Sequence, residues 1–245
     1  MRTYIGIDGC PFGWAATVFR MDNSTGQVFL YKHITELWEA HRDAELILID
    51  MPIGLPDTRH VRHCESEARA LLKPYRASSI FPVPVREVLE AANYDQAGEW
   101  QRRLSGKGLS KQTWNIVPKI RELDRLIRSE PLAKLRFQES HPELAFAAWS
   151  GAPMRNNKKT ESGYKERMEI LSKLYAPSEQ IVVDTLARTP RSQVARDDLV
   201  DSLALAVSAL HGSDGLAYVP NVTPPPEDGE GLVMRIAYPM RRMIY

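Results

Sequence analysis

The stretch YIGIDGCPFGWAATVF, at residues 4–19, decides how the fold begins. Residues 3–8 are rich in types that favour strands, and after a turn with proline and glycine a second apolar run follows at residues 13–20. This pattern predicts an antiparallel β-hairpin. Asp8 is the unusual residue of the hairpin, because it puts a carboxylate at the end of an otherwise apolar strand.

Two further strands are predicted beyond the hairpin. The run QVFLYKHI at residues 27–34 is the third strand of a meander, and AELILID at residues 44–50 is a fourth strand, which follows a short helix at residues 35–43. The fourth strand is nearly all apolar, which is typical of a parallel strand that is buried on both faces. It ends on a second acid, Asp50.

The rest of the chain has mainly helical patterns. After polar helices and loops come a long helix at residues 110–130, a fifth strand leading into a helix within 132–149, a basic amphipathic helix at 157–175, a buried helix at 195–212 and an edge strand at 232–239. We therefore predict one α/β domain over residues 1–245, with a mixed five-stranded sheet and helices on both faces. A helical insertion is predicted at residues 51–110, after the fourth strand.

The composition argues against several classes of protein. The formal net charge of +1 gives no global attraction to nucleic acid, so a local basic patch would have to hold any polyanion. The sequence has no apolar run of about eighteen residues, and its first residues lack the pattern of a secretory signal. The two cysteines, Cys10 and Cys64, make neither a disulfide framework nor a Cys-x-x-Cys site. We therefore expect a cytoplasmic protein with no membrane segment.

Acidic residues stand at the ends of elements that this topology brings to one edge of the sheet. Asp8, Asp50 and Glu139 each end a strand, and ligand sites in open α/β sheets lie outside the carboxyl ends of strands. Asp198 and Asp201 share one face at the start of a helix that is otherwise apolar almost all round. Burial of that helix against the sheet would carry both acids towards the strand ends.

Buried carboxylates that lie close together need cations if they are to stay ionised. Two Mg²⁺ or Mn²⁺ ions about 4 Å apart would meet that need, polarise a phosphodiester and activate a water. We expect Asp8 to bridge the two ions and Gly9 to leave the space beside it open. The expected metal ligands are Asp8, Asp50, Asp198 and Asp201, with Glu139 as a further catalytic acid.

Each of these acids also has an ordinary explanation. Asp8 and Asp50 both precede residues that signal turns. Acids at the start of a helix cap its N-terminus and compensate its dipole. Glu139 could pair with one of the many arginines. Their shared position at element ends favours a common site over these separate explanations.

Basic and aromatic residues before the long helix are candidates for substrate binding. Lys107 and Lys111 flank a glycine-containing turn at a helix N-terminus, where they could hold phosphate. Trp114 could stack on a base. The alternative is a solvated loop followed by a tryptophan of the core.

Three more candidates lie in the second half of the chain. Lys158 and Lys159 precede the basic helix and could contact a nucleic acid backbone, although such a run of charge is usually solvated. His141 could orient or protonate a leaving group near the ions. A lone histidine can equally have a structural role.

Seven blocks of the chain resemble, in order, the blocks of the domain-of-unknown-function 429 family. The blocks are GIDGCPFGW, IDMPIGLP, SSIFPVP, GKGLSKQTWNIVPKIRELD, ESHPELAF, NKKTESGYKERM and DDLVDSLALA. The resemblance covers roughly residues 3–240. It implies an RNase H-like fold and a nuclease activity.

Acids of the wider RNase H-like superfamily, which includes Holliday-junction resolvases, match four residues of this chain. The match implies that Asp8 is the acid of the first strand and Asp50 that of the fourth strand. It implies that Asp198 and Asp201 form the D-x-x-D pair of the closing helix. Glu139 is additional to that pattern, and Asp50 is shorter than the glutamate that resolvases often carry on the fourth strand.

The residues and the resemblance together predict a metal-dependent nuclease that hydrolyses phosphodiester bonds of DNA or RNA. An ATP-binding enzyme of the actin and sugar-kinase type is one alternative, because that superfamily also begins with a Gly-Ile-Asp stretch and a hairpin. Such enzymes need a second glycine-rich phosphate loop, which this sequence lacks. The other alternative is a non-catalytic binding module with the same fold. The kind of nucleic acid, the mode of cleavage and the oligomeric state remain open.

Overall fold

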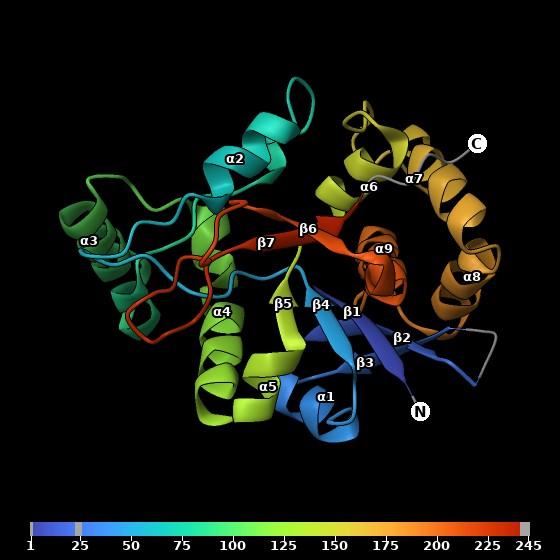
Figure 1. The fold of residues 1–245 in the computed structure, drawn as a ribbon, viewed down its shortest axis with the longest axis horizontal. Coiled ribbons are helices and arrows are strands. Elements are labelled where there is room, and N and C mark those ends of the chain that lie inside the picture. The colour runs from blue at the N-terminus through green and yellow to red at the C-terminus, as the bar shows by residue number, and fades with distance from the viewer. Residues whose placement is uncertain (1, 23–25, 241–245) are drawn as a thin grey trace.

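The computed structural model describes residues 2–22 and 26–240, and Figure 1 shows their arrangement. The strands of this part are β1 (Thr3–Gly9), β2 (Trp14–Arg20), β3 (Gln27–Tyr31), β4 (Leu46–Ile49), β5 (Phe137–Glu139), β6 (Leu216–Val219) and β7 (Ile236–Pro239). The α-helices are α1 (Ile34–Ala40), α2 (Cys64–Leu71), α3 (Tyr94–Ser105), α4 (Lys111–Ser129), α5 (Pro131–Arg136), α6 (Pro142–Ser150), α7 (Glu161–Leu174), α8 (Ser178–Arg188) and α9 (Arg196–Leu210). Short 3-10 helices are η1 (Ala77–Ser79), η2 (Arg86–Glu90) and η3 (His211–Asp214).

The main sheet has five strands in the order β3-β2-β1-β4-β5. The strands β1 and β2 form the predicted antiparallel hairpin, and β3 continues the meander. The strand β4 runs parallel to β1, and β5 runs parallel to β4, so Ile7, Ile49 and Glu139 lie in one row across the sheet. The predicted α/β fold is confirmed, and its mixed five-stranded sheet is that of an RNase H-like fold. The carboxyl ends of β1, β4 and β5 meet at one edge.

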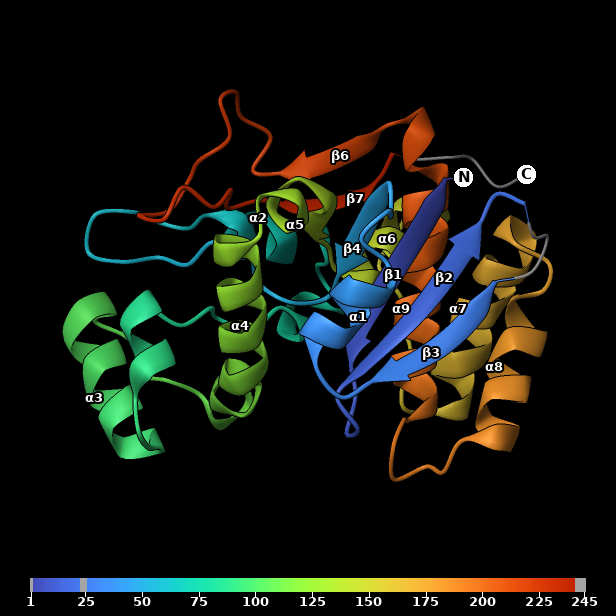
Figure 2. The ribbon, with the colours of Figure 1, turned by 90° about the horizontal axis from the view of Figure 1, so that it is seen from below.

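Side chains of β1 point alternately into two hydrophobic layers. Ile5 and Ile7 pack with α1 and α4 on one face of the sheet. Tyr4 packs on the other face with α6, α7, α8 and α9. Figure 2 shows the sheet between these two groups of helices. The same alternation turns Asp8 towards the face that α9 covers.

The absence of a side chain at Gly6 lets α9 approach β1 closely. A Cβ atom at Gly6 would lie 2.0 Å from the backbone nitrogen of Ala206 and 2.2 Å from the carbonyl oxygen of Ser202. The hydroxyl groups of Ser202 and Thr17 of β2 are 3.0 Å apart, which fixes the helix against the hairpin. This contact holds the first turns of α9 beside the carboxyl end of β1.

The predicted insertion at residues 51–110 contains α2, α3, η1, η2 and the loops between them (Figure 1). Two arginines join this segment to the rest of the molecule. Arg62 is buried and forms an ion pair with Glu139 at the end of β5. Arg86 forms an ion pair with Asp124 of α4. The segment is therefore held against the carboxyl edge of the sheet.

A small second sheet extends the edge of the main one. The strands β6 and β7 pair antiparallel, and an isolated bridge joins Ala237 of β7 to Ser140, which directly follows β5. The hydroxyl of Ser140 also donates a hydrogen bond of 2.7 Å to the carbonyl oxygen of Ala237. The edge strand expected at residues 232–239 is thus shorter than predicted, and its partner β6 was not predicted.

The sequence interpretation was wrong about the start of the fifth strand. Residues expected in the strand before Phe137 form the helix α5, and β5 has only three residues. Pro131 occupies the first turn of α5, where its missing N–H and fixed φ favour a helix, and Leu, Ala and Lys follow. Among the described residues, no helix is long and apolar enough to cross a membrane.

Candidate functional site

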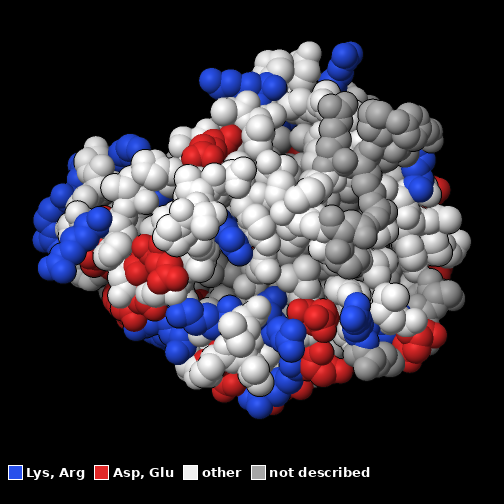
Figure 3. Space-filling model, viewed as in Figure 1, with Lys and Arg blue, Asp and Glu red and all other residues white. Residues whose placement is uncertain are grey.

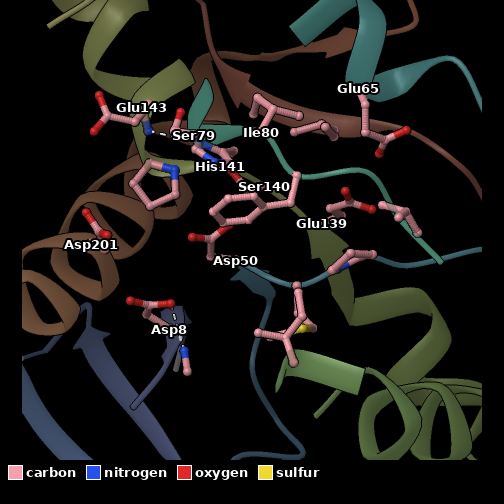
Figure 4. A pocket seen from close by; sticks show the side chains of 18 of the residues that line it. Asp8, Asp50, Glu65, Ser79, Ile80, Glu139, Ser140, His141, Glu143 and Asp201 are labelled. Atoms are coloured by element: carbon pink, nitrogen blue, oxygen red, sulfur yellow. Dashed lines mark hydrogen bonds between the residues drawn. The ribbon is translucent and has the colours of Figure 1, made fainter. Parts of the chain in front are cut away.

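A pocket with a volume of about 260 Å³ lies at the carboxyl edge of the sheet, and Figure 4 shows its interior. The carboxylates of Asp8, Asp50 and Asp201 surround one end of it, and in Figure 4 they face a common space. They come from three elements, because Asp8 lies in β1, Asp50 directly follows β4 and Asp201 lies in α9. The predicted convergence of these three acids is therefore present in the structure.

Two of the three aspartates are buried, and Asp50 is half-buried. Asp8 is 8% exposed and Asp201 is 1% exposed. Burial raises the pKa of Asp8 well above its usual range, and the neighbouring Asp50 and Asp201 raise it further. Burial also raises the pKa of Asp50, an effect that the neighbouring His141 and Lys158 oppose. The only hydrogen bond to the Asp8 side chain among the described residues comes from the N–H of Gly9, at 2.7 Å. The group therefore concentrates negative charge that a nearby cation stabilises.

Lys158 supplies such a cation from within the protein. It lies in the loop between α6 and α7, and its ammonium forms an ion pair with Asp201. Although burial lowers the pKa of Lys158, the charges of Asp201, Asp8 and Asp50 together raise it above its usual value. The ammonium therefore offsets the negative charge of the three carboxylates. The sequence suggested a different role for Lys158, which was contact with a nucleic acid backbone.

The loop that carries Lys158 is held in place by α7. Both carboxylate oxygens of Glu166 accept hydrogen bonds from backbone N–H groups, at 2.8 Å from Arg155 and 2.9 Å from Asn156. The fully buried Arg167 donates to the carbonyl oxygen of Asn156 at 3.2 Å. The position of the Lys158 backbone is therefore fixed, and its long side chain remains the adjustable part.

Asp198 does not line the pocket. It lies one turn before Asp201 in α9, and its Oδ2 accepts a hydrogen bond of 2.9 Å from the N–H of Ala195 at the helix N-terminus. Burial raises the pKa of Asp198 to about 6. The capping alternative is therefore realised in this structure, and the ligand role expected for Asp198 remains a prediction.

Glu139 lines the pocket, but both of its carboxylate oxygens are engaged in other contacts. Oε1 pairs with the guanidinium of Arg62, and Oε2 accepts a hydrogen bond of 2.8 Å from the N–H of Ile53. Arg62 also pairs with Glu65 at 2.7 Å. In Figure 4, Glu139 and Glu65 lie apart from the three aspartates. Glu139 therefore pairs with an arginine, which is the alternative that the sequence left open. Its carboxylate is not free in this structure for the expected catalytic role.

His141 lines the pocket at the N-terminus of α6. Its Nδ1 accepts a hydrogen bond of 3.2 Å from the N–H of Glu143, which leaves the proton of the neutral ring on Nε2. Figure 4 shows the ring next to Asp50. The ring can therefore offer an N–H donor inside the pocket, as the sequence suggested.

The other predicted substrate contacts do not line the pocket. Lys107, Lys111 and Lys159 are exposed, and the Lys111 ammonium lies 5.9 Å from the centre of the Tyr94 ring. Trp114 packs against the hydrophobic core and lies 6.1 Å from Tyr94, centre to centre, which is the core role left open by the sequence. Figure 3 shows basic side chains gathered over the end of the molecule that carries α3, and charges of both signs mixed elsewhere on that face. Direct contact of these residues with a group in the pocket is therefore not supported.

The comparison with protein families gives one match over most of the chain. The model described as "Protein of unknown function (DUF429)" matches residues 6–227. The chain belongs to the DUF429 family. The matched region contains the three pocket aspartates and Lys158. The searches of the curated proteins and of the solved structures gave no match.

Two residues of the DUF429 chain that the sequence did not single out also form the pocket. Lys119 of α4 lines the pocket beside Gly9, where a Cβ atom would be 3.0 Å from its Cδ, and its ammonium donates a hydrogen bond to the carbonyl oxygen of Gly13. The space that Gly9 was expected to leave open is therefore filled by Lys119. Phe81 also lines the pocket and is 42% exposed. Neither residue has a sequence signal, since one is a polar residue of an amphipathic helix and the other lies in a proline-rich loop.

The donor set of the DUF429 pocket fits a hard divalent cation, because it consists of carboxylate oxygens. Within the described residues, no three His, Cys, Asp or Glu side chains are already arranged to hold a metal ion. The Lys158 ammonium acts as a stand-in ion beside Asp201. Binding of a metal would thus require Lys158 to withdraw and the aspartates to close in.

Proposed function

We propose that this protein is a Mg²⁺- or Mn²⁺-dependent nuclease that hydrolyses phosphodiester bonds of nucleic acid. The observation that carries the proposal is the convergence of Asp8, Asp50 and Asp201 at one end of a pocket, with a cationic side chain already among them. Buried carboxylates without cations are unfavourable, so this arrangement by itself does not stabilise the fold. The arrangement is therefore best explained by a ligand that brings positive charge.

Each side chain has a defined task in this proposal. Bound divalent ions would polarise the scissile phosphate and activate a water. Asp8, Asp50 and Asp201 would hold the ions through their carboxylate oxygens. Lys158 would move away from Asp201 and pair with a phosphate oxygen. The Nε2–H of His141 can donate to the oxygen of the leaving group.

The proposal includes nucleic acid as the partner and the cytoplasm as the location. Both cysteines, Cys10 and Cys64, are free and buried, which suits a reducing compartment. The pocket offers Lys158 as a positive charge for a phosphodiester. These features support the proposal through local chemistry, since the net charge of +1 provides no general attraction to a polyanion.

The test is the substitution Asp8→Asn, which keeps the shape of the side chain and removes its charge. We expect cleavage of labelled DNA and RNA strands in Mn²⁺ to fall by at least about 100-fold, because ion binding contributes several kcal/mol to such reactions. Asp197→Asn is the matched control, since Asp197 lies in the same acidic region of α9 and does not line the pocket. We expect this control to keep its activity.

Two results would contradict the proposal. One is full cleavage by a correctly folded Asp8→Asn protein. The other is a wild-type protein whose melting temperature is unchanged by Mn²⁺ or Mg²⁺, because a metal that binds only the native state must raise it. The second result would favour a binding module without catalysis.

A further inference from the structure

The pocket has an apolar lining in addition to its aspartates. The segment from Ile80 to Pro84 lines it, together with Ile116 of α4 and Ile236 of β7. A ligand that fits the whole pocket therefore carries negative charge or a metal-bound group for the aspartates and an apolar, flat or compact group for this lining.

The apolar wall is fixed before any ligand arrives. The guanidinium of Arg69 in α2 donates two hydrogen bonds to the carbonyl oxygen of Ile80, at 2.6 and 3.0 Å. The hydroxyl of Thr113 in α4 donates to the carbonyl oxygen of Pro82 at 3.0 Å. The wall is thus bonded to helices on both sides of Phe81.

Phe81 is the exposed aromatic residue of this wall. Its side chain is 42% exposed although the residues on both ends of the segment are buried. A phenyl ring that is kept partly in water on a fixed backbone is a preformed stacking surface. Stacking on an aromatic ring suits any nucleobase, because every base presents a π face.

The depth of the aspartates restricts how a nucleic acid can reach them. Asp8 and Asp201 are almost fully buried, and the pocket is only about 260 Å³ in volume. A double helix is a wide and stiff object whose bases stack on one another, so its backbone cannot enter such a space. A single strand can enter it, because its bases separate and turn outwards at a modest energetic cost.

We infer that the pocket takes a single unstacked nucleotide of a single-stranded nucleic acid, with its phosphate at Asp8 and its base against Phe81. This inference rests on the proposed nuclease function and names its substrate class. It makes Phe81 a specificity-determining residue, since the ring discriminates an accessible base from a stacked one.

The experiment compares wild type and Phe81→Ala on three substrates of one length: a single strand, the same strand in a duplex, and a strand made of abasic residues. Wild type should cleave the single strand much faster than the duplex. Phe81→Ala should lower kcat/KM on the base-bearing strand by about 5- to 150-fold, which corresponds to loss of one stacked base. It should leave the abasic strand unaffected. Phe12→Ala is the matched control, because Phe12 is 40% exposed and lies outside the pocket lining.

A binding measurement separates stacking from catalysis. The affinity for a labelled base-bearing strand, measured by fluorescence anisotropy, should be higher for Asp8→Asn than for the double variant with Phe81→Ala, and an abasic strand should bind both proteins alike. Equal cleavage of duplex and single strand by wild type would overturn the inference. So would equal loss on base-bearing and abasic strands in Phe81→Ala, or no loss on either. In these cases an inactive Asp8→Asn would still support the nuclease proposal, whereas an active Asp8→Asn would remove that proposal and the inference with it.

Discussion

Lys158 is the residue on which the charge balance of the pocket depends. Its ammonium pairs with Asp201, which is almost fully buried, and adds favourable charge for Asp8 and Asp50. The sequence predicted that Asp8, Asp50, Asp198 and Asp201 would meet, because they stand at the ends of strands and at the start of an apolar helix, and all but Asp198 line the pocket. It could not predict that Lys158 lies among them. A loop residue has no periodicity, and the direction of a long side chain depends on how the loop is held.

Replacing Lys158 by methionine should destabilise the metal-free protein. We expect a loss of about 1–2 kcal/mol in the free energy of unfolding, less than for a fully buried pair, because the Lys158 side chain is 34% exposed. Urea unfolding measures this, and the exposed neighbour Lys159→Met is the control. Divalent metal should recover more stability in Lys158→Met than in wild type. An unchanged midpoint in the metal-free variant would show that the pair contributes nothing.

Asp198 makes stability depend on pH. Its pKa of about 6 in the folded protein lies above the value of about 3.9 in an unfolded chain. The folded state therefore keeps this proton to a higher pH than the unfolded chain does. The stability that the proton contributes is fully present below about pH 4 and is lost as the pH rises through 6. Asp198→Asn keeps a capping oxygen and removes the titration. Relative to wild type, the free energy of unfolding of Asp198→Asn should increase by on the order of 1–2 kcal/mol between pH 4 and pH 7. Denaturant unfolding without metal measures this. A constant difference over that range would contradict the shifted pKa.

At the scale of elements, the packing of α9 on β1 decides the geometry of the site. The sequence predicted α9 well, because its apolar residues cover nearly all sides and acids mark its start. It predicted α4 and the hairpin for similar reasons of local pattern. It misread the residues before β5, since a short strand of three residues leaves almost no alternation to detect. The sequence could not identify Arg62 as the partner of Glu139, because the two residues are 77 positions apart in the chain.

Gly6→Ala tests the closeness of α9. The new methyl group would collide with backbone atoms of Ala206 and Ser202, which cannot turn aside as a side chain does. We expect a loss of at least about 3 kcal/mol in the free energy of unfolding, or failure to fold. Gly98→Ala in α3 is the control, because no atom lies within 4 Å of its new Cβ, and we expect it to stabilise by about 0.5–1 kcal/mol. Equal stability of both variants would show that α9 is free to shift.

At the scale of the whole molecule, the site is a junction between the sheet and residues 51–110. The sheet and α9 supply the aspartates, and the insertion supplies the apolar wall with Phe81. The sequence predicted that an insertion exists and where it begins. It could not predict how the insertion folds back, because that depends on ion pairs between distant residues such as Arg62 and Glu139, and Arg86 and Asp228.

Substitutions in the Arg62–Glu139 pair should separate stability from catalysis. Arg62→Met leaves two buried acids without their partner and should destabilise by about 3–5 kcal/mol. Glu139→Gln keeps an acceptor for Ile53 and should destabilise less, by about 1–2 kcal/mol. We expect Glu139→Gln to keep most of the cleavage activity of wild type. A loss above 100-fold in a folded Glu139→Gln protein would instead make Glu139 the catalytic acid that the sequence suggested.

The ammonium of Lys158 beside Asp201 also bears on how this protein behaves in an assay. In the proposed nuclease, a divalent ion must displace the Lys158 ammonium from Asp201 before it can bind. The ammonium competes at a high effective concentration, because the backbone of its loop is anchored by Glu166 and Arg167. The Mn²⁺ concentration needed for half-maximal metal binding should therefore be higher for wild type than for Lys158→Met, because side chains change conformation too fast to delay binding. Preparations of the proposed nuclease that are screened with only trace metal would be scored as inactive.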